Sequence, residues 1–174
     1  GMIVGGGGQD TAATSSVTGN SFSGSFALKV GNSSASALNA TYNFWGDASR
    51  PEAGSDVTGN VTALPYYKDS GFSTAGPIRI VENGDAVGYG TIQSALAAST
   101  AGQTIELDGG AYSEAPININ KAVTIQGPNA GVVGNGSRAD EARISNTALH
   151  FTAAATLDGV EIHQTNNTAD AILV

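Results

Sequence analysis

The stretch Tyr89–Gly127, YGTIQSALAASTAGQTIELDGGAYSEAPININKAVTIQG, decides the fold class of this chain. Its apolar spacing predicts a helix over Thr91–Ser99, whose first residue is a predicted N-cap. Three short runs of alternating apolar residues follow, at Thr104–Leu107, Ile117–Asn120 and Val123–Gln126. One helix that leads into short strands, with no further helices, excludes a repeated βαβ arrangement. It predicts a coil of strands with a helical lid.

An ordered motif runs through this stretch, of the form T-I-x-L-x-x-G-x-Y-x-E and then I-x-I-x-K-x-V-T-I-x-G. Its residues are Thr104, Ile105, Leu107, Gly110, Tyr112, Glu114, Ile117, Ile119, Lys121, Val123, Thr124, Ile125 and Gly127. The motif closely resembles the start of right-handed parallel β-helix proteins of the pectate-lyase-like superfamily, in which an amphipathic helix caps the first coil. The resemblance implies a fold and no particular chemistry, because such folds host many functions.

A second motif, within residues 36–67, resembles the closing segment of many bacterial β-helix domains. Its residues are Asn39, Thr41, Asn43, Trp45, Gly46, Pro51, Asp56, Val57, Gly59, Val61, Pro65 and Tyr66. Trp45 is either a platform for a sugar or an aromatic plug over the last coil. Its apolar neighbours Tyr42 and Phe44 favour the plug.

The two motifs occur in inverted order, because the closing segment precedes the opening one. We therefore expect the last coils and closing cap of a β-helix at 1–67 and a linker at 68–90. The capping helix and first coils follow at 91–174. A short strand at Ile78–Val81 is expected to pair beside the first coil.

The expected fold class is thus an all-β, right-handed parallel β-helix with one short capping α-helix around 91–99. It is either circularly permuted or completed by a second chain. Solenoid ends without caps expose strand edges and apolar interior. The predicted partner is therefore a second copy, through a dimer with exchanged halves or a head-to-tail contact, unless the halves close on each other within one chain.

Further strands are predicted on both sides of the decisive stretch. They are Val17–Phe22, Phe26–Val30, Arg143–Ser145, Ala148–Thr152, Thr156–His163 and Ala171–Val174. Four isoleucines, Ile105, Ile125, Ile144 and Ile162, recur about every twenty residues, as in a solenoid repeat. This spacing predicts one inward-pointing isoleucine stack.

Composition restricts the partners and the compartment. Seven basic residues stand against fifteen acidic ones, for a net charge of -8. Nucleic acid and anionic membranes are therefore poor partners. The absence of cysteine excludes disulfides and thiol chemistry. A Thr-, Asn- and Gly-rich acidic chain with few charges favours a secreted or cell-surface bacterial protein, whose export signal is expected outside this segment.

Candidate catalytic groups are few, and the sequence assigns none of them a catalytic role. Glu106 and Asp108 share one face of a strand, as do Glu161 and His163. Both pairs are interpreted as the polar outer face of a half-buried strand. Asp158 is the remaining carboxylate on a predicted strand of this half.

Metal and cofactor sites are not predicted either. Two histidines, His150 and His163, lack a third ligand nearby in sequence, which disfavours zinc. Asp47, Glu52 and Asp56 carry oxygen ligands suited to calcium but lack a regular calcium-loop spacing.

Two functional classes remain. The leading prediction is a non-catalytic, adhesin-like module of a secreted or cell-surface repeat protein that presents a flat sheet to glycans. The alternative is a fragment of a carbohydrate-active enzyme, a polysaccharide lyase or glycoside hydrolase, whose catalytic coils lie outside this segment. Outward carboxylates clustered with Arg or Lys on one sheet would favour the enzyme, and an outer face of Thr, Ser and Asn would favour the module.

Overall fold

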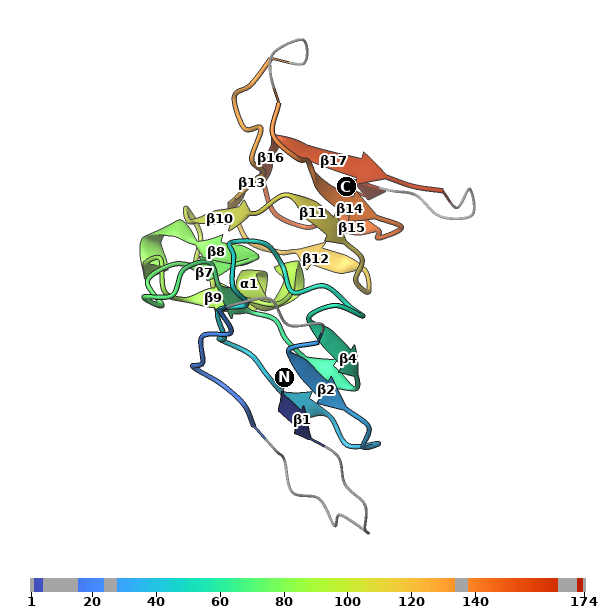
Figure 1. Cartoon of the computed structure of the whole chain (residues 1–174). Coiled ribbons are helices and arrows are strands. Elements are labelled where there is room, and N and C mark those ends of the chain that lie inside the picture. Colours follow the sequence, from blue (N-terminus) through green and yellow to red (C-terminus); the bar gives the residue numbers. More distant parts are fainter. Residues whose placement is uncertain (1, 5–15, 24–27, 134–137, 166–171, 174) are drawn as a thin grey trace. The chain divides into compact units, whose positions relative to one another are not determined.

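The computed structural model describes residues 2–4, 16–23, 28–133, 138–165 and 172–173 (Figure 1). Their regular structure is mostly β-strand, and the one α-helix among them is α1 (Ile92–Ala98). The chain forms two compact units, Gly1–Gly76 and Pro77–Val174, which we call unit 1 and unit 2. The boundary between them lies within the expected linker at 68–90.

The parallel strands of unit 2 form three sheets. These strands come from the decisive stretch and from the residues that follow it. The first sheet contains β10 (Thr104–Leu107), β13 (Thr124–Gln126) and β16 (Thr156–Asp158). The second contains β11 (Gly110–Tyr112), β14 (Ala142–Ser145) and β17 (Val160–His163). The third contains β12 (Ile117–Ile119), β15 (Leu149–Phe151) and β18 (Ile172–Leu173). Each sheet thus receives a strand from the first, second and third pass of the chain, which we call the first, second and third rungs.

The first rung is covered by α1 and by an antiparallel strand. β8 (Ile78–Ile80) pairs with β10 on the edge away from β13 and is followed by a 3-10 turn, η1 (Val81–Asn83), and β9 (Gly88–Tyr89). Ile78 and Ile80 are fully buried there. The prediction that this short strand pairs beside the first coil is confirmed.

Helix α1 begins where the sequence predicts, and its apolar face turns into the unit. The side chain of Thr91 accepts a hydrogen bond from the Ser94 amide at 3.1 Å, which completes a capping box. Ile92, Ala95 and Leu96 are buried. The helix and its N-cap are therefore confirmed.

Two charged residues of the opening motif hold the two ends of α1. The Glu114 carboxylate accepts hydrogen bonds from the backbone amides of Ile92 at 2.7 Å and Gln93 at 3.2 Å. The Lys121 ammonium donates to the carbonyls of Leu96 at 2.7 Å, Ala97 at 3.0 Å and Ser99 at 2.6 Å. An anion at the N-terminus and a cation at the C-terminus both oppose the helix dipole. The motif therefore fixes the helix to the first rung.

The predicted single isoleucine stack is wrong, because the four isoleucines belong to two sheets. Ile105 pairs with Ile125 and then Leu157 in the first sheet, whereas Ile144 pairs with Tyr112 and Ile162 in the second. The segment 127–141 carries the chain from one sheet to the other.

The predicted strand Thr156–His163 is also wrong as a single element, since it breaks at Gly159 into β16 and β17. Gly159 has a φ of 65°, and a Cβ there would lie 2.1 Å from the backbone nitrogen of Ala130. Only glycine fits this corner. β11 was not predicted; it lies between the predicted runs Thr104–Leu107 and Ile117–Asn120.

Burial falls along unit 2 from the covered rung to the third. Ile105 and Ile125 are at most 1 % exposed, whereas Leu157 is only half-buried. In the third sheet, Leu149 is 1 % exposed and Ile172 is 48 % exposed. The apolar interior of the third rung is therefore incompletely covered by the described residues.

Unit 1 also contains parallel strand pairs, followed by an antiparallel one. Its strands are β1 (Met2–Val4), β2 (Val30–Asn32), β3 (Leu38–Asn39), β4 (Val57–Gly59), β5 (Val61–Thr62), β6 (Tyr66–Tyr67) and β7 (Ala75–Gly76). The pairs β1–β2, β2–β4 and β3–β5 are parallel, and β6–β7 is antiparallel. The predicted strand Val17–Phe22 is wrong: its residue Ser21 makes only an isolated bridge. The predicted strand Phe26–Val30 lies partly outside the described residues, and β2 begins at Val30.

Trp45 fills the core of unit 1. Its side chain is 1 % exposed and stacks on Phe22 with ring centroids 5.0 Å apart. The burial expected of Trp45 is confirmed, and a ring this buried offers no platform to a sugar. Asn43, which is fully buried, donates to the carbonyls of Val17 at 2.6 Å and Ala40 at 2.7 Å.

Candidate functional site

The outer face of β10, β13 and β16 carries two files of polar side chains. Thr104, Thr124 and Thr156 occupy equivalent positions in the three strands, and Glu106, Gln126 and Asp158 occupy another set. Side chains alternate across a strand, so these residues lie opposite the buried isoleucines. Neighbouring parallel strands are about 4.8 Å apart, so each file repeats at that spacing.

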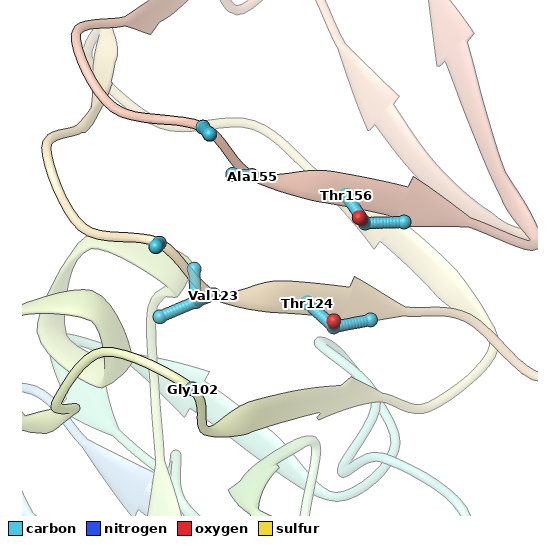
Figure 2. A pocket seen from close by; sticks show the side chains of 7 residues that line it. Gly102, Val123, Thr124, Ala155 and Thr156 are labelled. Carbon is cyan, nitrogen blue, oxygen red and sulfur yellow. The ribbon is translucent and has the colours of Figure 1, made fainter.

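A shallow hollow of about 260 Å³ opens beside the threonine file (Figure 2). Its lining residues are Gly102, Ala122, Val123, Thr124, Ala154, Ala155 and Thr156. Figure 2 shows the side chains of Thr124 and Thr156 at matching places on neighbouring strands. The space exists because the residue two positions before each threonine is small, namely Gly102, Ala122 and Ala154. The hollow therefore combines aligned hydroxyls with small apolar groups.

Ion pairs and hydrogen bonds hold the carboxylates near this face. Arg79 bonds both Glu106 and Asp85 through its guanidinium. The Glu82 carboxylate accepts from the Thr104 amide at 3.1 and 3.2 Å. Glu106 thus serves as a partner of Arg79, and Asp108 directly follows the last residue of β10.

A second polar group lies on the outer face of β14 and β17. The Nε of Arg143 donates to the Glu161 Oε2 at 2.8 Å, and the Nδ1 of His163 lies 3.6 Å from the Glu161 Oε1. The three side chains are 35 to 49 % exposed. The structure therefore does bring a carboxylate, an arginine and a histidine together on one sheet.

A hollow of about 290 Å³ adjoins this group, lined by Gly109, Gly110, Ala111, Asp140, Glu141 and Arg143. The side-chain amide of Asn129, followed by the Arg138 guanidinium, holds the pKa of Glu141 below its ordinary value. The Asn129 amide also closes the loop before β14: it donates to the Ala139 carbonyl at 2.9 Å and accepts from the Ala139 amide at 2.8 Å. Glu141 is thus a stabilised anion, which makes it a weak proton donor.

The acidic residues considered for calcium lie in unit 1 and engage other groups. Asp56 accepts from the Glu52 amide at 2.8 Å and forms an ion pair with Lys29 at 2.7 Å. Asp47 accepts from the Ser49 amide at 2.7 Å. His150 and His163 belong to different sheets, β15 and β17. Within the described ranges, no group of three or more His, Cys, Asp or Glu residues could hold a metal ion.

Sequence analysis missed the hollow beside Thr124 and Thr156. The available signal was a short repeat, Ala122-Val123-Thr124 and Ala154-Ala155-Thr156, in which a small residue precedes each outward threonine by two positions. The repeat was hidden because the loop at 127–141 lengthens one pass of the chain.

No protein-family model, curated protein or solved structure matches this chain. No helix in the described part of the chain has the length and apolar character that a bilayer crossing requires.

Proposed function

We propose that this chain is a right-handed parallel β-helix of the pectate-lyase-like type, acting as a non-catalytic, adhesin-like module of a secreted or cell-surface protein. The opening motif supports this fold, as do the parallel pairing of β10 with β13 and β16 and the helix that covers the first rung. The acidic, threonine-rich composition supports the location.

The proposed ligand is a neutral glycan bound on the outer face of β13 and β16. The hollow beside Thr124 and Thr156 carries this proposal, because sugars present hydroxyls at their edges and C–H groups on their faces. The threonine hydroxyls would exchange hydrogen bonds with the sugar, and the exposed methyl groups of Ala122 and Ala154 would contact its apolar face. The net charge of -8 disfavours the binding of glycans that contain anionic uronates.

Isosteric substitution tests the glycan site. Thr124→Val and Thr156→Val remove one hydroxyl each with little change of shape. A neutral hydrogen bond contributes about 0.5–1.5 kcal/mol, so each variant should raise Kd about 2- to 12-fold. Isothermal titration calorimetry with soluble xylan, galactomannan and dextran measures the Kd of each variant. Thr152→Val, on an exposed threonine outside the hollow, is the matched control. Binding that survives both hollow variants unchanged would refute the site.

A second candidate is acid–base chemistry by a carbohydrate-active enzyme, favoured by Arg143, Glu161 and His163 on one outer face. Mutual pairing of Arg143 and Glu161 weakens this reading. Release of reducing ends, or of unsaturated products absorbing in the ultraviolet, from pectate and neutral polysaccharides would support it if His163→Ala abolished the activity.

We also propose self-association as the partner interaction. It is supported by the half-buried Leu157 and exposed Ile172 of the third rung, which leave apolar interior to be covered by another copy or by the other half of the chain.

A further inference from the structure

The free edge of β17 has a self-complementary pattern. β17 pairs with β14 on one side, and no described strand pairs with its other side. An open strand edge is a template for another strand. The following inference deepens the proposed self-association and rests on it.

The direction of the backbone groups in β17 follows from one hydrogen bond. The Asn146 amide donates to the His163 carbonyl at 2.9 Å, so His163 directs its backbone groups toward β14. Backbone groups of successive residues in a strand point to alternate sides, so Glu161 also faces β14. The amide and carbonyl of Val160 and Ile162 therefore face the open edge.

This alternation limits how a second β17 can pair in an antiparallel two-fold arrangement. A closely hydrogen-bonded pair must form between residues whose backbone groups face the open edge. Centring the two-fold axis on Ile162 meets this requirement, because Ile162 then exchanges both of its hydrogen bonds with the same residue of the second copy.

Charge selects this register over its neighbours. With Ile162 at the centre, Glu161 of each copy lies opposite His163 of the other, on the outer face. A shift of two residues in one strand, which moves the two-fold axis by one residue, places Glu161 opposite Glu161, and the opposite shift places His163 opposite His163. Two carboxylates directly opposite each other destabilise a cross-strand pair, whereas an imidazole opposite a carboxylate can donate a hydrogen bond to it.

We propose that two copies of this chain associate through antiparallel pairing of their β17 strands, centred on Ile162, with reciprocal Glu161–His163 contacts. The two sheets β11–β14–β17 then form one continuous sheet across the two-fold axis. The geometry of Glu161 suits this contact. Arg143 holds its Oε2, while its Oε1 is 3.6 Å from His163 of its own chain, longer than a hydrogen bond.

A single strand pair buries little surface area, and the apolar end of the third rung would add to the area that the dimer interface buries. A hollow of about 300 Å³, lined by Phe151, Ala153, Ala154, Ala155 and Ile172, lies at this end. Stable interfaces bury about 1,200–2,000 Å² in total. Covering these side chains moves the contact toward that range, which favours a second copy over a short peptide.

A charge series at one exposed position tests the proposal. Light scattering behind a sizing column, over a hundredfold concentration range, should show a closed dimer for the native chain. His163→Lys should strengthen it and His163→Glu should weaken it, each by about 2- to 30-fold in Kd, because symmetry doubles a cross-strand charge pair. Asn118→Glu and Asn118→Lys, on the outer face of β12, are matched controls that should leave Kd unchanged.

Crosslinking tests the register directly, because the chain contains no cysteine. The Cα atoms of a hydrogen-bonded antiparallel pair are about 5.5 Å apart, within disulfide range. Ile162→Cys should therefore give a covalent dimer on oxidation. Val160→Cys should not, because this register separates the two copies of residue 160 by more than about 10 Å.

The outcomes separate the two levels of the proposal. A monomer at all concentrations would overturn both the pairing and the self-association. Mass that climbs without limit would retain self-association and overturn the closed β17 pair. Equal crosslinking by the two cysteine variants, or a dimer indifferent to His163, would overturn the Ile162-centred register.

Discussion

Replacing Lys121 with methionine tests whether the opening motif stabilises unit 2 by holding α1. Lys121→Met keeps an unbranched stem of similar length and removes the ammonium, which donates to three carbonyls at the end of the helix, at 2.6 to 3.0 Å. The change therefore removes a cation from the negative end of the helix dipole with little loss of packing.

The magnitude follows from these contacts. A hydrogen bond to a charged group contributes about 1.5–3 kcal/mol, and a cation at a helix C-terminus about 0.3–2 kcal/mol. The three bonds share one charge, and Lys121 is only half-buried, so water can replace part of its role. These effects do not add. We expect a loss of about 2 kcal/mol in the free energy of unfolding, or about 10 °C in Tm for a unit of about 100 residues.

Urea unfolding followed by circular dichroism measures the loss, and hydrogen exchange across residues 91–99 localises it. Arg143→Met is the matched control, since it removes one positive charge from a side chain that is 49 % exposed. A surface ion pair contributes about 0–1 kcal/mol, so this control should change little. If Lys121→Met costs no more than Arg143→Met, or leaves helix exchange unchanged, the helix clamp has no energetic role.

Three further predictions concern other parts of the chain. Gly159→Ala should destabilise unit 2 by at least about 2 kcal/mol in urea unfolding, because the residue adopts a positive φ and its Cβ would meet Ala130. Trp45→Ala should cost about 3–5 kcal/mol in the unfolding of unit 1, whereas a surface tryptophan would cost little. Hydrogen bonds from the Ser73 amide and its neighbours lower the pKa of Asp69. Because the folded pKa lies below the unfolded one, this stabilisation is complete above about pH 4 and is lost as pH falls through the lowered pKa. The protection of the Ser73 and Thr74 amides against hydrogen exchange, relative to their intrinsic rates, should decrease there, and Asp69→Asn should remove this pH dependence.

Elements fixed by local patterns were predictable from the sequence. The helix could be placed because Thr91 begins it and its apolar residues follow one face. The strand β10 has the predicted bounds because its apolar and polar residues alternate in a run set off by turn residues. The burial of Trp45 was also predictable, because its aromatic neighbours in sequence indicated it.

Features that depend on how successive passes of the chain align with one another were not predictable from the sequence. A spacing of about twenty residues led to the prediction that Ile125 and Ile144 belong to one stack. In the structure the two residues lie in different sheets, because the chain changes sheet between them. Periodicity records the interval between apolar residues but not which sheet receives each one. The break at Gly159 was hidden for the same reason, since its close neighbour Ala130 is distant in sequence.

The two proposed surfaces use different atoms of the second and third rungs, so they are separable. Glycan contact would use the outward side chains of Thr124 and Thr156, which project away from the sheet. Association would use the backbone edge at Ile162 and the side chains of Glu161 and His163, in another sheet. Thr124→Val should therefore alter glycan affinity without changing the mass in solution, and His163→Glu should do the reverse. If each variant altered both properties, glycan and second copy would compete for one surface, and the assignment of side chains to one role and strand edge to the other would fail.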